Sequence, residues 1–510
     1  MKKAIPVLLM MVMLVGVVLA GCGDNSPSSS GKPSGQAERG DSSKDSNASK
    51  EPVEITVMLS GPGVPDLDKN PIWQQLSNDL NMDMELNVIA SEYDQQLNVK
   101  MAGGTPPDLF NIGKVPLTEM GRQGLLLDLE PYLDDMPNVK ALYDENLLNK
   151  GRVDGTLYAL PKRADIPMDS LWIRKDWLER LDLEMPTNLE TFKEVALAFT
   201  NEDPDGNGKA DTYGITGTAL YTFAPIFGAY GTGGPGSYAI KGGELVYTTE
   251  DPAFREALSY IADLIAAGVV DPEIMANKGT DDQQKAFQGK AGILFRGWGE
   301  LVKDSYVEQY KSINPDAEWV QVGALEGPGD NYMSVWDLGR TPNRLAIPKS
   351  LEKSPEKLEQ VLELLNYVTG DGKGQNIVNY GIEGTHYKVE NGEVVPLPAM
   401  SDLDYSWQMQ LTARDELAYL SVKFANQKPY IAFAQEQPRL EVYDSFIPVP
   451  QGVVADDKTT YETEEITKFI YGRRPLGDYD QFIETLYKQF QLQLYLDSAE
   501  DTLTELGYLQ

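Results

Sequence analysis

Hydrophobic residues recur along the chain either at every second position or at every third to fourth position. The first spacing predicts strands, and the second predicts helices. Residues 53–58 read VEITVM, with apolar side chains at alternate positions, as expected for a strand. Residues 84–89 (MELNVI) and 107–112 (PDLFNI) predict two more strands. The segments between them carry helical spacing, so this part of the chain is predicted to alternate strand and helix.

Apolar residues spaced three or four apart mark the helices. Ile72, Leu76 and Leu80 share one face of a helix that leads into the second strand. Further segments of this kind are residues 93–101, 252–267 and 355–369, the last two beginning at prolines and stopping at glycines. This order of elements is the signature of an α/β architecture with parallel strands.

The first 22 residues predict export and a lipid anchor. Lys2 and Lys3 precede an apolar run, residues 4–20, that is short for a membrane-spanning helix. The sequence then reads Leu-Ala-Gly-Cys, and Cys22 is the only cysteine of the chain. We interpret residues 1–21 as a lipoprotein signal peptide and Cys22 as a diacylated anchor that holds the protein at the extracellular face of a Gram-positive cell membrane. The alternative is a signal anchor with a chance cysteine.

Residues 22–52 predict a flexible tether between this anchor and the folded body. From position 23 to position 52 the sequence contains no Ile, Leu, Val, Met or aromatic residue, so it has nothing to bury and cannot offset the entropy of ordering. Serine and glycine dominate, as in linkers that behave as random coils.

Composition excludes several classes of function. A formal net charge of −34 disfavours nucleic acid as a partner. The single histidine, His386, excludes a histidine-rich metal site and leaves only one candidate base for a Ser-His-Asp triad. Using the only cysteine as a lipid anchor excludes disulfides, cysteine nucleophiles and cysteine metal sites.

Seven segments, taken together and in this order, resemble family 1 of the extracellular solute-binding proteins of ABC importers, in the branch of LplA-like Gram-positive lipoproteins and alginate-oligosaccharide binders. They are ITVMLS, GGTPPDLF, SLWIRKDWLERLDLEMPTNLETFKEVALAF, DPDGNGKADTYGIT, GKAGILFRGWGE, RLAIPKS and NYGIEGTHYK. The resemblance implies an α/β, two-lobed periplasmic-binding-protein-like fold with discontinuous lobes and a ligand cleft between them. The implied N-terminal lobe is 53–163 plus 327–398, and the C-terminal lobe is 164–326 plus 399–510.

The loop DPDGNGKAD has the spacing of a calcium site. Counted as an EF-hand loop, its oxygen ligands at positions 1, 3, 5, 7 and 9 are Asp203, Asp205, Asn207, the carbonyl of Lys209 and Asp211. Position 12 is glycine, and Thr212 stands where alginate-binding relatives carry an acidic residue, so the shell is short of a charge and is completed by water. The alternative is an Asx-turn loop that never binds metal.

The elements around this loop indicate a structural rather than a regulatory Ca²⁺. An incoming helix is predicted from a capping box of Thr187 and Glu190, and no exit helix follows, because TYGITG predicts a turn into a strand. A sensor needs two helices whose angle changes on binding, so we expect the ion to act as a staple.

Aromatic side chains in loops are candidates for sugar contacts, because the C–H face of a sugar stacks on a flat apolar surface. Trp298 lies between two glycines, which predicts an exposed indole, and the resemblance places a ligand-stacking tryptophan there. The other aromatic candidates are Trp336 in an irregular stretch, Trp407, Trp172 at a helix start, and Tyr213. Packing in the core is the alternative for each of the four tryptophans.

Four polar residues complete the predicted ligand site. They are Arg163 at the first crossover between lobes, Asp108 at the end of a strand, and Glu383 with His386 in a segment between glycines. If the ligand carries uronates, Lys162, Arg163 and Arg174 are the cations able to pair with its carboxylates. A neutral oligosaccharide is equally compatible.

We therefore interpret the chain as a lipid-anchored binding protein that captures an oligosaccharide and delivers it to the permease of an ABC importer, without catalysis. The main alternative is an exported carbohydrate-active enzyme, a glycosidase or lyase, that recruits paired carboxylates from the 78 acidic residues. A peptide-binding protein of the same fold is a second alternative, because function resides in the site and not in the fold.

Overall fold

A computed structural model describes residues 52–62, 69–162, 166–370, 372–403, 407–411, 414–450 and 452–510, all within the unit Pro52–Gln510. The signal peptide, Cys22, the tether as far as Glu51, and Arg163 lie outside the described residues. Within the described ranges, no helix is both long enough and apolar enough to cross a membrane.

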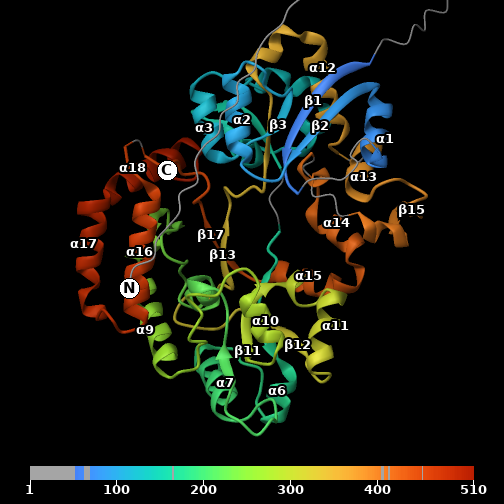
Figure 1. The fold of residues 1–510 in the computed structure, drawn as a ribbon. Coiled ribbons are helices and arrows are strands. Elements are labelled where there is room, and N and C mark those ends of the chain that lie inside the picture. Colours follow the sequence, from blue (N-terminus) through green and yellow to red (C-terminus); the bar gives the residue numbers. More distant parts are fainter. Residues whose placement is uncertain are drawn as a thin grey trace, which may run out of the picture. The chain divides into compact units, whose positions relative to one another are not determined.

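The first sheet has five strands (Figure 1). Their order is β2 (Met82–Ile89), β1 (Val53–Ser60), β3 (Leu109–Asn111), β14 (Arg344–Ala346) and β6 (Ala159–Pro161). The strands predicted at 53–58, 84–89 and 107–112 are confirmed. Within this sheet the predicted parallel pairing is confirmed for these three strands, whereas β14 runs antiparallel to both β3 and β6. The sheet is therefore mixed.

Helices cover both faces of the first sheet, which explains why the consecutive β1 residues Val57, Met58 and Leu59 are all apolar and buried. Ile55, Val57 and Leu59 point to one face and join a core cluster with helices α1 and α12. Met58 points to the other face and joins a smaller cluster with α2 and α3. Figure 1 shows the resulting three layers; the helices are α1 (Pro71–Leu80), α2 (Tyr93–Ala102), α3 (Lys114–Arg122) and α12 (Pro355–Tyr367).

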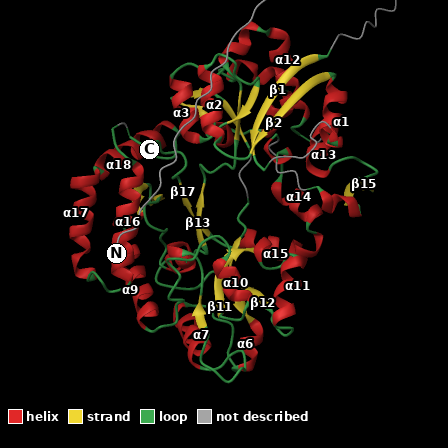
Figure 2. Ribbon diagram, viewed as in Figure 1, coloured by secondary structure: helices red, strands yellow, loops and turns green. Residues whose placement is uncertain are grey.

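Two four-stranded sheets form the framework of the rest of the molecule (Figure 2). One has the order β12 (Trp319–Val322), β7 (Asp169–Arg174), β11 (Ala291–Gly297) and β8 (Tyr213–Ile215). The other has the order β10 (Glu244–Tyr247), β9 (Tyr238–Lys241), β17 (Arg439–Val442) and β13 (Ser334–Asp337). Trp172 therefore lies on strand β7 and not at a helix start, and Trp336 lies on strand β13 and not in an irregular stretch.

The helix predicted before the acidic loop is confirmed as α7 (Leu189–Asn201), but its predicted cap is wrong. Asn188 is the N-cap residue, and its side-chain oxygen accepts from the Thr191 N–H at 2.9 Å. The capping box is thus shifted by one residue from Thr187 and Glu190. Thr191 can take the place of the usual Glu or Gln because its hydroxyl reaches the N-cap N–H.

The remaining elements pack around these three sheets. Two-stranded hairpins are β4 (Arg152–Val153) with β5 (Thr156–Leu157), and β15 (Tyr387–Glu390) with β16 (Glu393–Pro396). The other main helices are α6 (Lys175–Arg180), α8 (Ala224–Ala229), α9 (Pro252–Ala266), α10 (Asp281–Phe287), α11 (Asp304–Ile313), α13 (Lys373–Tyr380), α14 (Glu416–Lys423), α15 (Lys428–Glu436), α16 (Ala455–Ile470), α17 (Tyr479–Phe490) and α18 (Leu492–Glu505). The shortest are α4 (Pro137–Leu142) and α5 (Glu145–Asn149). The prolines that begin α9 and α12 confirm those two predicted helix starts.

Candidate functional site

The carboxyl ends of β1 and β3 carry two polar side chains that are bonded to each other. Ser60 ends β1 and Asn111 ends β3. The Ser60 N–H donates to Asn111 Oδ1 at 2.9 Å, and Asn111 Nδ2 donates to Ser60 Oγ at 2.8 Å. Parallel strands end at the same edge of a sheet, and ligands of open α/β sheets bind in the crevice outside that edge. The Ser60–Asn111 pair therefore marks the edge where a ligand is expected.

Two more amides converge on this pair from distant parts of the chain. Asn111 Nδ2 donates to Gln410 Oε1 at 2.7 Å, and Asn343 Nδ2 donates to the same oxygen at 3.2 Å. Gln410 Nε2 donates in turn to the Ser60 carbonyl. Within the part of the chain that the structure describes, the Asn343 side-chain carbonyl has no hydrogen-bond partner, so it can accept from a ligand hydroxyl.

A cavity of about 500 Å³ opens beside this cluster, and we call it the amide cavity. Its volume is typical of small-molecule sites. The Tyr93 hydroxyl on its wall lies 2.7 Å from the Asn111 carbonyl, and burial raises the pKa of Tyr93, which keeps the hydroxyl protonated. The cavity is lined by Ser60, Glu92, Tyr93, Asp94, Gln95, Asn111, Gly113, Pro342 and Asn343.

The lining of the amide cavity suits a ligand rich in hydroxyl groups. Its amide side chains each offer both donors and acceptors, and a sugar hydroxyl needs one of each. Glu92 and Asp94 are exposed and add carboxylate acceptors at the rim. The neighbouring Pro342 and Tyr93 supply apolar surface of the kind that lies against sugar C–H groups.

Trp298 and Trp172 are buried in the core. Trp298 is 1% exposed and makes an edge contact with Phe424 at a centroid distance of 5.2 Å, so the exposure predicted from its flanking glycines is not observed. Trp172 is fully buried, and its indole N–H donates to the Arg296 carbonyl at 2.9 Å. Both indoles belong to the same apolar cluster as the first sheet. Their contact with a ligand stays a prediction.

The other aromatic candidates lie apart from the amide cavity lining. Trp407 is fully buried and meets Trp73 edge-on at 5.5 Å, although it lies only three positions from Gln410 in the sequence. Trp336 is half-buried on β13, opposite Glu441 on β17. Tyr213 is half-buried at the start of β8, where its N–H donates to the Lys290 carbonyl at 2.8 Å. For these three residues too, ligand contact stays a prediction.

Asp108 lies at the opposite end of β3 from the amide cavity. It precedes the strand and lies beside Thr56 in the middle of β1, and not at the carboxyl edge from which it was predicted to face a ligand. Its Oδ2 accepts from the N–H and the hydroxyl of Thr56, both at 2.9 Å, and from Lys357 at 3.1 Å. These contacts tie β1 to α12 and describe a structural role.

The remaining predicted polar residues are His386, Glu383 and Arg163. His386 is buried, and its Nδ1 accepts from the Ile382 N–H at 2.9 Å. Burial lowers the pKa of His386, which favours the neutral ring. Glu383 is exposed, and Arg163 lies outside the described residues. The structure thus places neither His386 nor Glu383 in the lining of the amide cavity.

Two of the cations predicted to pair with uronates, Lys162 and Arg174, are buried. The Arg174 guanidinium is almost completely buried and donates to both carboxylate oxygens of Asp176, at 2.7 and 2.6 Å. It also lies over the Trp177 and Trp319 rings. Lys162 is buried as well. Arg174 is therefore a packing and ion-pairing residue.

The acidic loop folds around the amide of Asn207. The Asn207 N–H donates to Asp203 Oδ1 at 2.9 Å, and its side-chain amide donates to Asp205 Oδ2 at 2.7 Å and to Asp211 Oδ1 at 3.1 Å. Burial, with the nearby Asp203 and Asp211 carboxylates, raises the pKa of Asp205. Within the described residues, no group of three or more His, Cys, Asp and Glu side chains is placed to hold a metal ion. The hydrogen bonds of Asn207 hold the loop in a compact turn, and its side-chain oxygens are of the hard type that Ca²⁺ takes.

Ser60, Asn111, Asn343 and Gln410 were not among the residues predicted to bind a ligand. Ser60 and Asn111 have a sequence signal, because each is the first polar residue that closes an apolar strand. Asn343 and Gln410 have none, because Gln410 meets Asn111 across 299 positions of sequence. Such a contact is set by the fold as a whole.

Comparison with known proteins places these features in a family. The profile of the bacterial extracellular solute-binding proteins matches residues 83–375. The chain is similar to lipoprotein LipO of Bacillus subtilis (strain 168), with 26% identity over 437 residues that cover 83% of this chain and 80% of LipO. It is also similar to the polygalacturonan/rhamnogalacturonan-binding protein YtcQ of the same organism, with 26% identity over 387 residues, 74% of this chain and 73% of YtcQ.

A solved structure shares the fold. It is the S. pneumoniae ABC-transporter substrate-binding protein FusA, as an EF-hand mutant in complex with fructo-nystose. The TM-score is 0.62 at 18% sequence identity, and the match covers 89% of this chain and 99% of FusA. At this identity the likeness shows the fold alone.

Proposed function

Since the chain belongs to the bacterial extracellular solute-binding proteins, we propose that it captures an oligosaccharide in the amide cavity and delivers it to the permease of an ABC importer. Members of this family are binding components of transport systems and not enzymes. The ligand is therefore expected to leave the protein chemically unchanged.

The amide cavity is the observation that carries this proposal. Four side chains from separate segments, Ser60, Asn111, Asn343 and Gln410, are held in one hydrogen-bonded cluster at the carboxyl edge of the first sheet. A cluster whose groups orient one another binds a ligand with little further loss of side-chain freedom. Uncharged amides also match neutral sugar hydroxyls without the cost of burying a charge.

The names of the relatives support a carbohydrate ligand. YtcQ is named for binding polygalacturonan and rhamnogalacturonan, and the FusA structure holds fructo-nystose. These relatives bind chemically different sugars, one acidic and one neutral. The class that they share, an oligosaccharide, is the one that we propose here.

We further propose that two lobes close over the ligand. The N-terminal lobe would be 53–163 plus 327–398, and the C-terminal lobe would be 164–326 plus 399–510. A ligand that bridges the lobes binds the closed form better than the open form, and this difference shifts the population toward closure. The closed form would then dock on the permease.

Lipidation of Cys22 would keep the protein at the extracellular face of the cell membrane. The relative LipO is named as a lipoprotein, and this chain has a Leu-Ala-Gly-Cys motif at residues 19–22, directly after an apolar run. Replacing Cys22 by Ser should release the protein from the membrane fraction into the medium. A variant that stays with the membrane would refute the anchor.

Calcium would act as a structural staple in the acidic loop. The side chains of Asp203, Asp205, Asn207 and Asp211 and the carbonyl of Lys209 would hold the ion. Asp203, Asp205 and Asp211 all accept hydrogen bonds from Asn207, and Asp205 carries a raised pKa that a cation would reverse. The ion would neutralise the mutual repulsion of the carboxylates. The FusA structure is named as an EF-hand mutant, and an EF-hand in that relative supports the proposal of a calcium site here.

Thermal unfolding of the full chain in detergent, with a panel of neutral and acidic oligosaccharides, tests the proposal. A sugar present at a hundred times its dissociation constant contributes about 2.7 kcal/mol and raises Tm visibly. The sugar is then recovered and its length measured. Recovery of an intact ligand supports a binding protein, whereas shortened products would contradict it. Tm shifts with peptides and none with sugars would favour a peptide carrier.

A further inference from the structure

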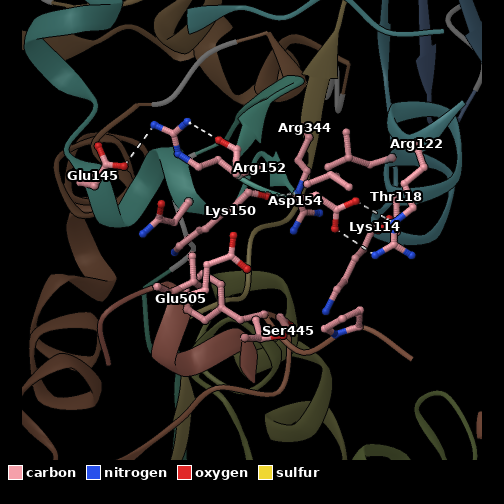
Figure 3. Close-up of a pocket in the computed structure, with 18 residues that line it drawn as sticks. Lys114, Thr118, Arg122, Glu145, Lys150, Arg152, Asp154, Arg344, Ser445 and Glu505 are labelled. Atoms are coloured by element: carbon pink, nitrogen blue, oxygen red, sulfur yellow. Dashed lines mark hydrogen bonds and ion pairs between the residues drawn. The ribbon is translucent and has the colours of Figure 1, made fainter. Parts of the chain in front are cut away.

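A second cavity, of about 430 Å³, lies beside α3, the β4–β5 hairpin and α18 (Figure 3). We call it the cationic cavity, because Lys114, Arg122, Lys150, Arg152 and Arg344 all line it. Figure 3 shows these side chains around one space with Glu505 and Ser445. The chain as a whole has a net charge of −34, so this concentration of positive charge needs a physical reason.

Two of the five cations are neutralised by carboxylates. Arg122 donates to both oxygens of Asp154 at 3.0 Å. Arg152 forms ion pairs with Glu130 and with Glu145, at 2.6 and 3.1 Å. The dashed lines of Figure 3 include such pairs. These two arginines are satisfied and belong to the wall of the cavity.

The other three cations have no carboxylate within ion-pairing distance among the described residues. Lys114 Nζ donates to the Ile447 carbonyl at 2.7 Å, and Lys150 Nζ donates to the Arg340 carbonyl at 3.2 Å. Arg344 donates through Nε to the Lys150 carbonyl. Each of these side chains thus keeps further N–H donors that no protein group in the described chain takes up.

Burial makes three unpaired charges costly. Arg344 is 7% exposed, and the two lysines are half-buried. Burial lowers the pKa of Lys114 to about 8, with the Arg344 charge adding to the effect, and burial also lowers the pKa values of Lys150 and Arg344. Asp337 opposes these shifts from a distance, but its oxygens already accept from the N–H groups of Gly339 and Ser445.

We propose that the cationic cavity binds an oxyanion, a carboxylate or a phosphate, through Lys114, Lys150 and Arg344. An arginine fork and two ammonium groups supply directional and point-charge donors to such a ligand. The cavity volume leaves room for a group larger than a single ion. The ligand is either a small free anion or the acidic end of a longer sugar.

Residues that are adjacent in the sequence line the cationic cavity and the amide cavity. Gly113 lines the amide cavity and Lys114 lines the cationic cavity; the same is true of Asn343 and Arg344. Lys114 is the first residue of α3 and Arg344 is the first residue of β14, so the two cavities are adjacent where these elements begin. The inference itself stands on the three cations and does not require the proposed sugar function.

Glu505 provides an internal check on this inference. It is the exposed carboxylate of α18 at the cationic cavity, and its Oε1 lies near Gly155 on the opposite β4–β5 hairpin. A negative charge at this position repels an incoming anion. Replacing Glu505 by Gln should therefore raise the affinity for an anion, whereas a loss of affinity would contradict the proposed placement.

The direct test is titration calorimetry of the full chain in detergent at constant ionic strength in chloride. The probes are citrate, inorganic phosphate and galacturonate. Lys114→Gln and Lys150→Gln should each weaken binding of the active probe about tenfold, the scale of one lost charge-assisted hydrogen bond. Lys353→Gln, at an exposed site on the 3-10 helix Lys349–Lys353, is the matched control and should bind like the parent.

The three probes distinguish a free small anion from the acidic group of a sugar. Binding of citrate or phosphate assigns the site to a free small anion, and binding of galacturonate alone assigns it to an acidic sugar. Absence of binding by all three probes, or equal affinities in the parent and both lysine variants, would overturn the inference. A neutral oligosaccharide measured in the same variants should keep its affinity, so failure of the anion site is distinguished from failure of the amide cavity.

Discussion

The amide cavity and the cationic cavity are built from the same two backbone segments, yet they offer opposite chemistry. Asn343 and Gly113 face an uncharged cluster of amides, whereas Arg344 and Lys114, one residue further along, face a group of unpaired cations. The amides bond to one another, and the cations bond to backbone carbonyls. From this difference we infer that polar groups already hydrogen-bonded to one another suit a ligand with hydroxyl groups. Charged groups that lack an ion-pair partner suit a ligand of opposite charge.

Asn111→Leu is expected to lower oligosaccharide affinity and to leave anion affinity unchanged. This change therefore distinguishes the amide cavity from the cationic cavity. This change removes the centre of the amide cluster, which bonds to Ser60 and Gln410. We expect oligosaccharide affinity to fall about thirtyfold or more, about 2 kcal/mol, because several buried hydrogen bonds are lost at once. Calorimetry should show unchanged anion affinity. Asn78→Leu, on the exposed face of α1, is the control, and a parallel loss in that variant would mean that the effect is not local.

Asp108→Asn should affect stability and not binding. Asp108 stands at the other end of the strand that carries Asn111, and its charge holds Thr56 and Lys357. Loss of that charge should lower the free energy of unfolding by about 1 kcal/mol, measured by urea denaturation. Asp83→Asn, at an exposed position on β2, should be neutral. A drop in sugar affinity for Asp108→Asn would mean that both ends of β3 contribute to ligand binding.

Chelation of calcium should lower the free energy of unfolding by the same amount in the free and in the ligand-bound protein. With a dissociation constant typical of extracellular sites and calcium near 1 mM, the ion contributes about 1 kcal/mol. Adding EDTA should lower Tm in the parent and leave the Asp203→Ala, Asp205→Ala double variant unchanged. The affinities of both cavities should not move, because the loop lines neither of them. A chelator-dependent change in sugar affinity would contradict a purely structural ion.

A change of stability with pH is expected from Lys114 in the cationic cavity. The pKa of Lys114 is lowered to about 8, while in the unfolded chain it returns to 10.5. Between these values the unfolded chain binds more protons, so stability rises with pH across this window. Lys114→Met should flatten the rise in urea-unfolding measurements at pH 8, 9 and 10. An unchanged slope would show that Lys114 is not desolvated.

Local sequence patterns were enough to predict the first elements of the fold. The alternation in β1, the spacing of Ile72, Leu76 and Leu80 in α1, and the proline that begins α9 each depend on neighbouring residues. The antiparallel insertion of β14 into the first sheet was not predictable in this way, because its partners lie far away in the sequence. The family resemblance supplied the two-lobed architecture that periodicity alone did not.

The candidate site was harder to predict for two physical reasons. β3 has only three residues, so an error of a few positions in the strand boundary exchanges its two ends. Asp108, which was predicted to bind ligand, lies at its amino end, and Asn111 lies at its carboxyl end. Trp298 shows the second reason. Glycines next to an indole give the backbone freedom, but the packing of Phe424 decides whether the ring is exposed. Gln410 reaches the cluster only through the complete fold.

Hydrogen–deuterium exchange of the full chain, with and without a bound oligosaccharide, tests the central claim most directly. The account predicts slower exchange in peptides that contain Ser60, Asn111, Asn343 and Gln410, the four residues of the amide cluster. The groove between α9 and α17 should exchange at the same rate in both samples. Protection confined to that groove, with none at the amide cluster, would contradict the assignment of the amide cavity as the ligand site.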